Sequence, residues 1–171
     1  MISRFIVFMF MIGSVVWTAD HNLTTERTII SVGEVNTLSD WDRLINAIIY
    51  VESRGNDSAI GDKGKAVGCL QIHPICVREV NRILRKNDMP LVYTLEDRYN
   101  RTKSIEMFNI IAEQYECCEY TTFMEYAEIV SRRWNGGPKG HKKRATIKYW
   151  NKVYSVYYKK LFGLAQTTPN T

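Results

Sequence analysis

Apolar residues recur every three or four positions in several stretches of the chain, which is the spacing of one buried helix face. The first stretch begins at Ser39, a predicted N-cap with Asp42 as its capping-box partner. Residues 55–68 break the spacing with Gly, Asp, Asn and Lys, so we expect a loop or a small irregular hairpin there. The pattern predicts a mainly α-helical domain with one irregular Gly-rich tongue. The expected helices are residues 39–53, one that begins near Pro74, residues 102–117, one from about Thr122 that stops before Gly136, and residues 145–162.

One acidic residue lies on the apolar face of the first expected helix. Glu52 follows Ile48 by four residues, Ile45 by seven and Trp41 by eleven, which places all four on one side. Apolar burial and the partial negative charge of a helix C-terminus both disfavour a carboxylate, so both should raise the pKa of Glu52. A carboxyl group that stays protonated near neutral pH can protonate the departing oxygen of a glycosidic bond. The alternative is an exposed helix-end acid, or one paired with a base such as Arg54.

The two ends of the chain differ from its middle. A basic start at Arg4 and an apolar run over residues 5–17 are typical of an export signal, here residues 1–19. The run is shorter than the roughly 20 residues that cross a bilayer, although an uncleaved anchor or a buried N-terminal helix would also fit. We therefore expect an exported protein, periplasmic or extracellular, either free or anchored by this segment. The expected organisation is a linker over 20–38, a catalytic domain over 39–163 and a tail over 164–171.

Composition favours one globular domain: the chain has 171 residues, 45% of them hydrophobic and 24% charged, which argues against a disordered or multi-span protein. Charge is unevenly placed, because no acidic residue follows Glu128 while ten Lys and Arg residues do. Such a surface would attract an anionic wall polymer or a membrane surface, or it is simply a solvated basic face. Nucleic acid is not expected as a partner, because an exported protein seldom meets it.

Four cysteines lie beyond the expected leader and would meet an oxidising compartment after export. The adjacent residues Cys117 and Cys118 are not expected to form a disulfide with each other, because that geometry is strained. Two interpretations stay open: a disulfide from one of them to Cys76 or Cys69, or four reduced thiols. The three histidines show no zinc-site spacing with these cysteines, so we expect neither a metal nor an organic cofactor.

Four motifs follow one another from residue 52 to residue 149 and carry a family resemblance. They are Glu52-Ser53 at a helix end, Gly68-Cys69-Leu70-Gln71-Ile72 after the Gly-rich loop, Arg133-Trp134-Asn135-Gly136-Gly137-Pro138, and Thr146 with Tyr149 on the last helix. In this order they resemble the lysozyme-like superfamily, specifically the lytic transglycosylases and the goose-type lysozymes. The resemblance implies a lysozyme-like helical fold.

The resemblance also implies a role for each matching residue. Glu52 would be the catalytic acid, Ser53 a support for it or for substrate, and Gln71 and Asn135 contacts to the sugar. Tyr149 would orient Glu52 or stabilise the oxocarbenium-like transition state. Amide side chains suit such contacts because they both donate and accept hydrogen bonds. The structural alternatives are that Asn135 caps a helix and that Tyr149 is one more core aromatic residue.

Two mechanisms compete within the resemblance. Asp62 looks like the acid with which goose-type lysozymes position or activate water, and a second carboxylate of this kind fits inverting hydrolysis. Lytic transglycosylases use a single Glu as acid and then as base, while a hydroxyl of the substrate closes a 1,6-anhydro ring. His73 stands where goose-type enzymes carry a further Asp, which weakens the case for hydrolysis and makes His73 a candidate substrate contact. Asp62 is alternatively an ordinary turn residue.

The function implied is cleavage of the β-1,4 bond between N-acetylmuramic acid and N-acetylglucosamine in peptidoglycan glycan strands, by a monomeric enzyme. Chitin is a minor alternative substrate. Two other classes fit parts of the sequence: a wall-binding or virion-associated lysozyme-like module without catalysis, and a cationic membrane-active or nucleic-acid-binding protein. These residues are compatible with a protein from a phage or from a bacterium.

Overall fold

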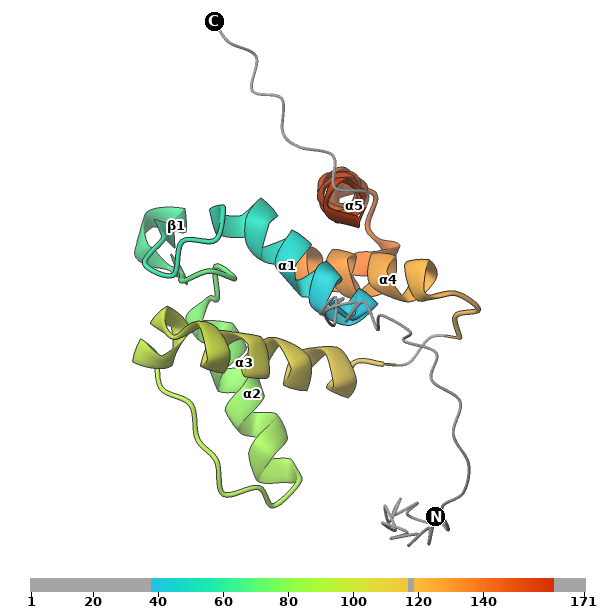
Figure 1. Ribbon diagram of the computed structural model, residues 1–171. Coiled ribbons are helices and arrows are strands. Elements are labelled where there is room, and N and C mark those ends of the chain that lie inside the picture. The colour runs from blue at the N-terminus through green and yellow to red at the C-terminus, as the bar shows by residue number, and fades with distance from the viewer. Residues whose placement is uncertain (1–37, 117–118, 162–171) are drawn as a thin grey trace, which may run out of the picture. The chain divides into compact units, whose positions relative to one another are not determined.

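The computed structural model describes residues 38–116 and 119–161 (Figure 1). These residues belong to one compact unit. The expected leader, nearly all of the expected linker, Cys117, Cys118 and the C-terminal tail lie outside them. Within the described part, no helix is long and apolar enough to cross a membrane.

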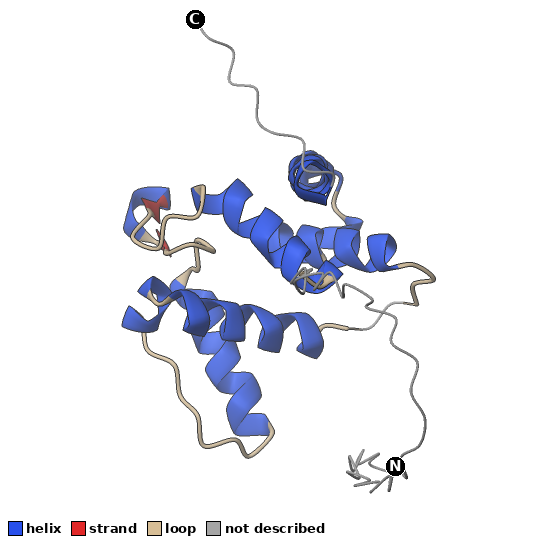
Figure 2. Cartoon of the chain, in the orientation of Figure 1, coloured by secondary structure: helices blue, strands red, loops and turns tan. Residues whose placement is uncertain are grey.

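The mainly helical architecture predicted from the sequence is confirmed (Figure 2). Short 3₁₀ helices connect the longer elements: η1 (Asp62–Gly64), η2 (Glu96–Tyr99), η3 (Gly140–Lys142) and η4 (Arg144–Thr146). The α-helices and strands are α1 (Asp40–Ser53), β1 (Ile60–Gly61), β2 (Ala66–Val67), α2 (Pro74–Lys86), α3 (Arg101–Gln114), α4 (Phe123–Gly136) and α5 (Ile147–Leu161).

Side-chain caps mark the starts of α1 and α4. The Ser39 hydroxyl accepts a hydrogen bond from the Asp42 backbone N–H at 3.1 Å, as predicted. The predicted reciprocal half of that capping box is wrong, because the Asp42 carboxylate accepts from the Ser39 hydroxyl instead, at 2.6 Å. A complete capping box, with Glu125 as the partner of Thr122, opens α4. The last helix starts at Ile147, later than expected, because the preceding residues form η4.

Two groups of helices share one hydrophobic core. In the first group, α1 packs along α5 and also touches α4, and Leu44, Ile48 and Val153 are fully buried there. In the second group, α2 packs against α3 (Figure 1). Aromatic side chains connect the groups, since the Phe108 ring of α3 lies 5.8 Å from that of Trp41 and 4.9 Å from that of Trp134. The two groups therefore pack into one core, to which α1 contributes Leu44 and Ile48.

The Gly-rich stretch forms a small hairpin, which confirms the second of the two predicted forms. Strands β1 and β2 pair antiparallel, with Ile60 opposite Val67, and an isolated bridge links Val67 to Ile72. Gly68 has φ +81°, and a Cβ there would lie only 1.8 Å from the Arg98 carbonyl oxygen. Close approach between the tongue and η2 therefore requires glycine at this position.

Candidate active site around Glu52

The packing of α1 on α5 brings together two side chains that are 97 residues apart in the chain. Glu52 lies in the last turn of α1 and Tyr149 in the first turn of α5. The Tyr149 hydroxyl donates a hydrogen bond to Glu52 Oε1 at 2.6 Å. This contact joins the first and the last motif of the sequence in one site.

Burial decides the protonation of this pair. Desolvation raises the pKa of Glu52 above its ordinary value, while the Tyr149 hydrogen bond and the charge of Lys152 lower it by less. Burial and the neighbouring Glu52 carboxyl also hold the pKa of Tyr149 well above its usual range, so that phenol remains a donor. Arg54, the alternative partner of Glu52, donates instead to the Tyr50 hydroxyl at 2.6 Å. The site therefore favours a neutral carboxyl group held by a neutral phenol.

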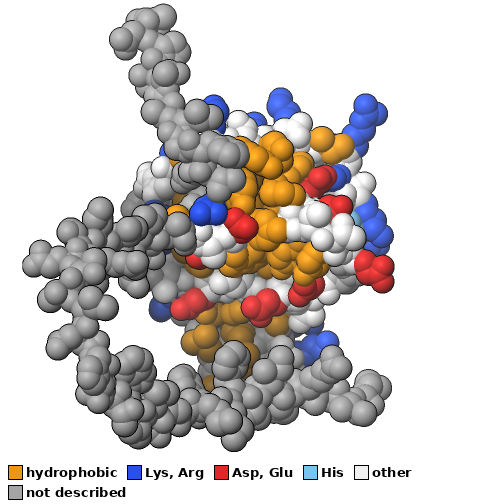
Figure 3. Space-filling model, turned by 45° about the vertical axis from the view of Figure 1, so that its right-hand side comes forward, with side chains coloured by type: hydrophobic (Ala, Val, Ile, Leu, Met, Phe, Trp, Pro, Cys, Tyr) orange, Lys and Arg blue, Asp and Glu red, His pale blue; other side chains and the backbone are white. Residues whose placement is uncertain are grey.

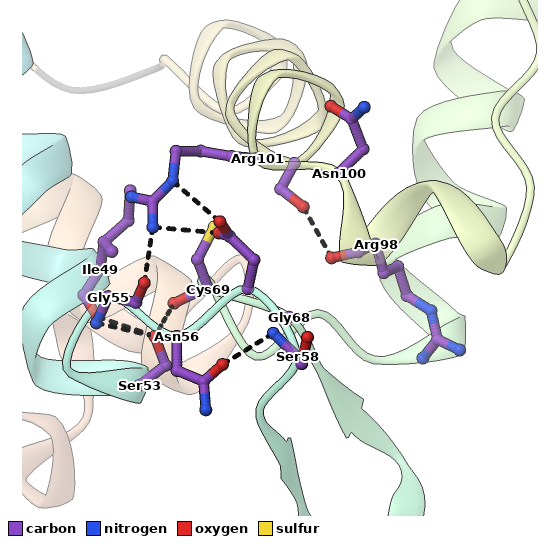
Figure 4. A network of polar contacts seen from close by, with 12 residues as sticks. Ile49, Ser53, Gly55, Asn56, Ser58, Gly68, Cys69, Arg98, Asn100 and Arg101 are labelled. Carbon is purple, nitrogen blue, oxygen red and sulfur yellow. Dashed lines mark hydrogen bonds and ion pairs between the residues drawn. The ribbon is translucent and has the colours of Figure 1, made fainter.

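Ser53 ties the end of α1 to the motif that follows the tongue. Its hydroxyl lies 2.8 Å from the Cys69 carbonyl oxygen and 3.3 Å from that of Ile49, and it accepts from the Gly55 N–H at 3.2 Å (Figure 4). These contacts join the end of α1 to the Cys69 backbone, and the role of Ser53 as a support for the acid or for substrate stays a prediction.

Gln71 uses its amide donors inside the tongue. Its Nε2 donates to the Gly68 carbonyl at 3.0 Å and to the Ala59 carbonyl at 3.3 Å, and its backbone is left-handed, with φ +50°. A Cβ at Gly61 would lie 2.3 Å from Gln71 Oε1, so glycine is needed for the amide to fit. These contacts make Gln71 a structural tie of the hairpin, and the sugar contact stays a prediction.

Asp62 and His73 form a second pair, separate from the bond between Glu52 and Tyr149. The distance from Asp62 Oδ2 to His73 Nε2 is 3.7 Å, and both side chains are exposed to solvent, by 55% and 39%. Asp62 is at the start of η1 and His73 is the residue before α2. The two residues that distinguish the competing mechanisms are therefore brought together.

The motif around Asn135 forms the turn between α4 and η3. Asn135 is exposed near the end of α4, and the capping position is Gly137, whose N–H donates to the Arg133 carbonyl at 2.7 Å. A Cβ at Gly140 would lie 2.0 Å from the Arg132 carbonyl oxygen. The turn is thus built from glycines and leaves the Asn135 side chain at the surface, where its sugar contact stays a prediction.

A cavity of about 310 Å³ opens between α2, α3 and the end of α4. Its wall is mostly apolar, with Phe108 and Trp134 among the rings, and Glu79 and Arg133 supply polar groups. Trp134 belongs to the same motif as Asn135, which connects this cavity to the family resemblance. Neither Glu52 nor Tyr149 lines it, so the cavity by itself does not identify the reacting centre.

The sequence did not single out the contacts that Arg101 makes with Gly55 and Asp57, just after the end of α1, close to Cys69 (Figure 4). Burial and the charge of Asp57 raise the pKa of the Cys69 thiol to about 11, so this cysteine is an unreactive, buried group. Within the part of the chain that the structure describes, Cys69 and Cys76 are free thiols, and Cys117 and Cys118, the partners considered for a disulfide, lie outside it. Among the described residues, no group of His, Cys, Asp and Glu side chains could hold a metal ion.

The basic residues of the C-terminal quarter lie largely at the surface. Lys142, Lys143, Arg144, Lys148 and Lys152 are exposed. In the space-filling view, Lys and Arg side chains project from the upper part of the domain, and hydrophobic side chains gather below them (Figure 3). The predicted cationic surface is therefore present along η4 and the first part of α5.

Comparison with known proteins gives one family. The description of that family is transglycosylase SLT domain, and its profile matches residues 34–155. Curated proteins give no match, and solved structures give none either. The matched range contains all four motifs and both partners of the Glu52–Tyr149 hydrogen bond. The chain therefore belongs to the transglycosylase SLT domain family, and its activity is of the peptidoglycan lytic transglycosylase type.

Proposed function

We propose that this protein cleaves the β-1,4 bond between N-acetylmuramic acid and N-acetylglucosamine, with Glu52 as general acid and then as general base. The observation that carries the proposal is the partly buried Glu52, whose burial raises its pKa and so favours the protonated form, and whose Oε1 is held by Tyr149. Because Oε1 already accepts the Tyr149 hydroxyl, the proton for the substrate is expected on Oε2. The glycosidic oxygen takes this proton as its bond to C1 of the muramic residue breaks.

The product we propose is a 1,6-anhydro end. The Glu52 carboxylate formed in the first step takes the proton of the C6 hydroxyl, whose oxygen closes the ring on C1, so no water is consumed. The pairing of Asp62 with His73 supports this choice, since the partner of the second carboxylate is His73, while Glu52 is held by Tyr149. We propose that the Tyr149 hydroxyl, which is held beside Glu52, also stabilises positive charge that develops at the sugar.

The apolar cavity between α2, α3 and α4 is proposed to receive sugar residues next to the cleaved bond. Rings such as Trp134 offer flat faces to the sugar, while Glu79 and Arg133 can exchange hydrogen bonds with its hydroxyl and N-acetyl groups. Because peptidoglycan lies outside the cytoplasm, we place the enzyme there as well.

The test is mass spectrometry of peptidoglycan digested by the purified full-length chain. Anhydro-ended fragments should dominate and should be lighter by one water than fragments with reducing ends. Reducing ends as the main product would contradict the transglycosylase step and would favour hydrolysis with Asp62 as the second carboxylate. An undigested sample would contradict catalysis altogether.

A second expectation concerns the Tyr149→Phe variant. Because the Tyr149 hydrogen bond lowers the pKa of Glu52, its loss should raise that pKa further. The acid form then persists to higher pH, so the alkaline limb of the kcat profile should move upward. At the optimum, kcat should fall by about 10-fold, as expected for one lost orienting hydrogen bond of roughly 1.4 kcal/mol. A limb that moves downward would contradict the role assigned to this bond.

A further inference from the structure

Three segments that are distant in sequence meet at the C-terminal end of α1. They are the turn after Glu52 (residues 53–57), the return of the tongue at residues 68–69, and the stretch from η2 to the first turn of α3 (residues 98–104) (Figure 4). Arg101 is the first residue of α3 and points into this junction. It therefore connects the second group of helices to the segment that carries the catalytic acid.

The Arg101 guanidinium makes three contacts with the turn. Its Nη2 donates to the Gly55 carbonyl at 2.6 Å and lies 3.0 Å from Asp57 Oδ1, while Nε donates to Asp57 Oδ2 at 3.2 Å. The planar fork of arginine suits this arrangement, in which both carboxylate oxygens and a carbonyl are held together. Both charged side chains are 41% exposed, so the pair is partly screened by water and its main effect is geometric.

The turn that Arg101 holds is an unusual piece of backbone. Arg54 and Gly55 have consecutive positive φ angles, +59° and +87°, directly after the Glu52–Ser53 pair. Such a turn needs external contacts to keep one conformation. The Ser53 hydroxyl supplies one through the Cys69 carbonyl, and Arg101 supplies the others through Gly55 and Asp57.

We propose that Arg101 is a positioning residue for the glycosidase reaction, which sets the orientation of Glu52 by clamping the turn at Gly55 and Asp57. The proposal depends on the proposed role of Glu52 as the catalytic acid. Arg101 holds the backbone three and five residues after Glu52, at Gly55 and Asp57. Tyr149 of α5 holds the Glu52 carboxyl group itself, so the acid is fixed from two sides. A shift of about 1 Å at a reacting group can cost up to about 100-fold in rate.

The test compares kcat and KM of the full-length variants Arg101→Gln, Asp57→Asn and the double variant on purified peptidoglycan. Each single variant should lose about 10- to 100-fold in kcat with KM changed by less than about twofold, and the double variant should lose no more than either. Arg101→Lys keeps the charge but not the fork and should recover only part of kcat. The control is Lys103→Gln, at a residue in the same turn of α3 as Arg101. This variant breaks the ion pair between Lys103 and Asp97 and should leave kcat unchanged.

The pH profile separates positioning from charge. By charge alone, Arg101→Gln should raise the pKa of Glu52 and Asp57→Asn should lower it, so the alkaline limbs would move in opposite directions. If the clamp keeps Glu52 buried, both variants admit water and both limbs should move to lower pH, because burial is the largest cause of the raised pKa. Opposite shifts would overturn the proposal, as would lower melting temperatures with kcat unchanged.

The Glu52→Gln variant separates failure of the clamp from failure of the proposed function. If Glu52→Gln is inactive while both clamp variants keep full kcat, only the clamp is wrong. If Glu52→Gln retains full kcat, the proposed function is wrong as well.

Discussion

Replacing Glu52 with glutamine is expected to lower kcat by about 10²- to 10⁴-fold, the usual contribution of a general acid and base. The amide has nearly the shape of the carboxyl group and can still accept the Tyr149 hydrogen bond, but it cannot donate a proton to the glycosidic oxygen or remove one from the C6 hydroxyl. The measurement is the initial rate at which the purified full-length chain releases soluble fragments from peptidoglycan.

The control for this variant is its stability, which should rise at neutral pH. Below the ordinary pKa of about 4.5, the carboxyl is neutral in both folded and unfolded chains, so glutamine should change little. As the pH rises, the unfolded chain ionises first, because burial raises the pKa of Glu52 in the folded state. The wild-type protein therefore loses stability relative to Glu52→Gln until the folded pKa is passed, and a melting-temperature gap should open above about pH 4.5.

Undiminished lysis by Glu52→Gln would instead favour the cationic membrane-active alternative. Exposed residues such as Lys148 and Lys152 would then be the working groups, and the lysis should weaken steeply with added salt. A non-catalytic wall-binding module would also be recognised by the fragment-release measurement. Such a module would bind peptidoglycan, but neither the wild-type chain nor Glu52→Gln would release fragments from it.

The helices and the central pair of the site could be predicted because each has a repeated or ordered signal in the sequence. The apolar spacing from Trp41 to Glu52 placed the acid on the inner side of α1, where it lies near buried Ile48. The contact between Glu52 and Tyr149 came from the family resemblance, since nothing in the local spacing around Tyr149 distinguishes it from other aromatic residues of α5. Periodicity thus located one partner and motif order located the other.

The contacts inside the tongue could not be predicted, because they depend on single backbone angles. Gln71 looked like a free amide, but its positive φ turns the side chain toward the Gly68 and Ala59 carbonyls. Arg101 carried no signal at all, since its partners lie 44 and 46 residues earlier in an irregular turn. Neither propensity nor periodicity encodes contacts of this kind, which arise only once the elements have packed.

Gly68→Ala tests the tongue contact most directly and should destabilise the fold by about 3 kcal/mol or more, beyond the common range for single substitutions. The new Cβ would lie 1.8 Å from the Arg98 carbonyl oxygen and 2.9 Å from its carbon, and neither backbone atom can yield without moving η2. The matched control is Gly64→Ala, at φ +88° in the same tongue but with no atom within 4 Å of the new Cβ. This control isolates the cost of the left-handed conformation, about 1 kcal/mol. Urea unfolding of both variants gives the comparison, and equal losses would mean that backbone strain alone, rather than the contact with η2, makes glycine necessary at position 68.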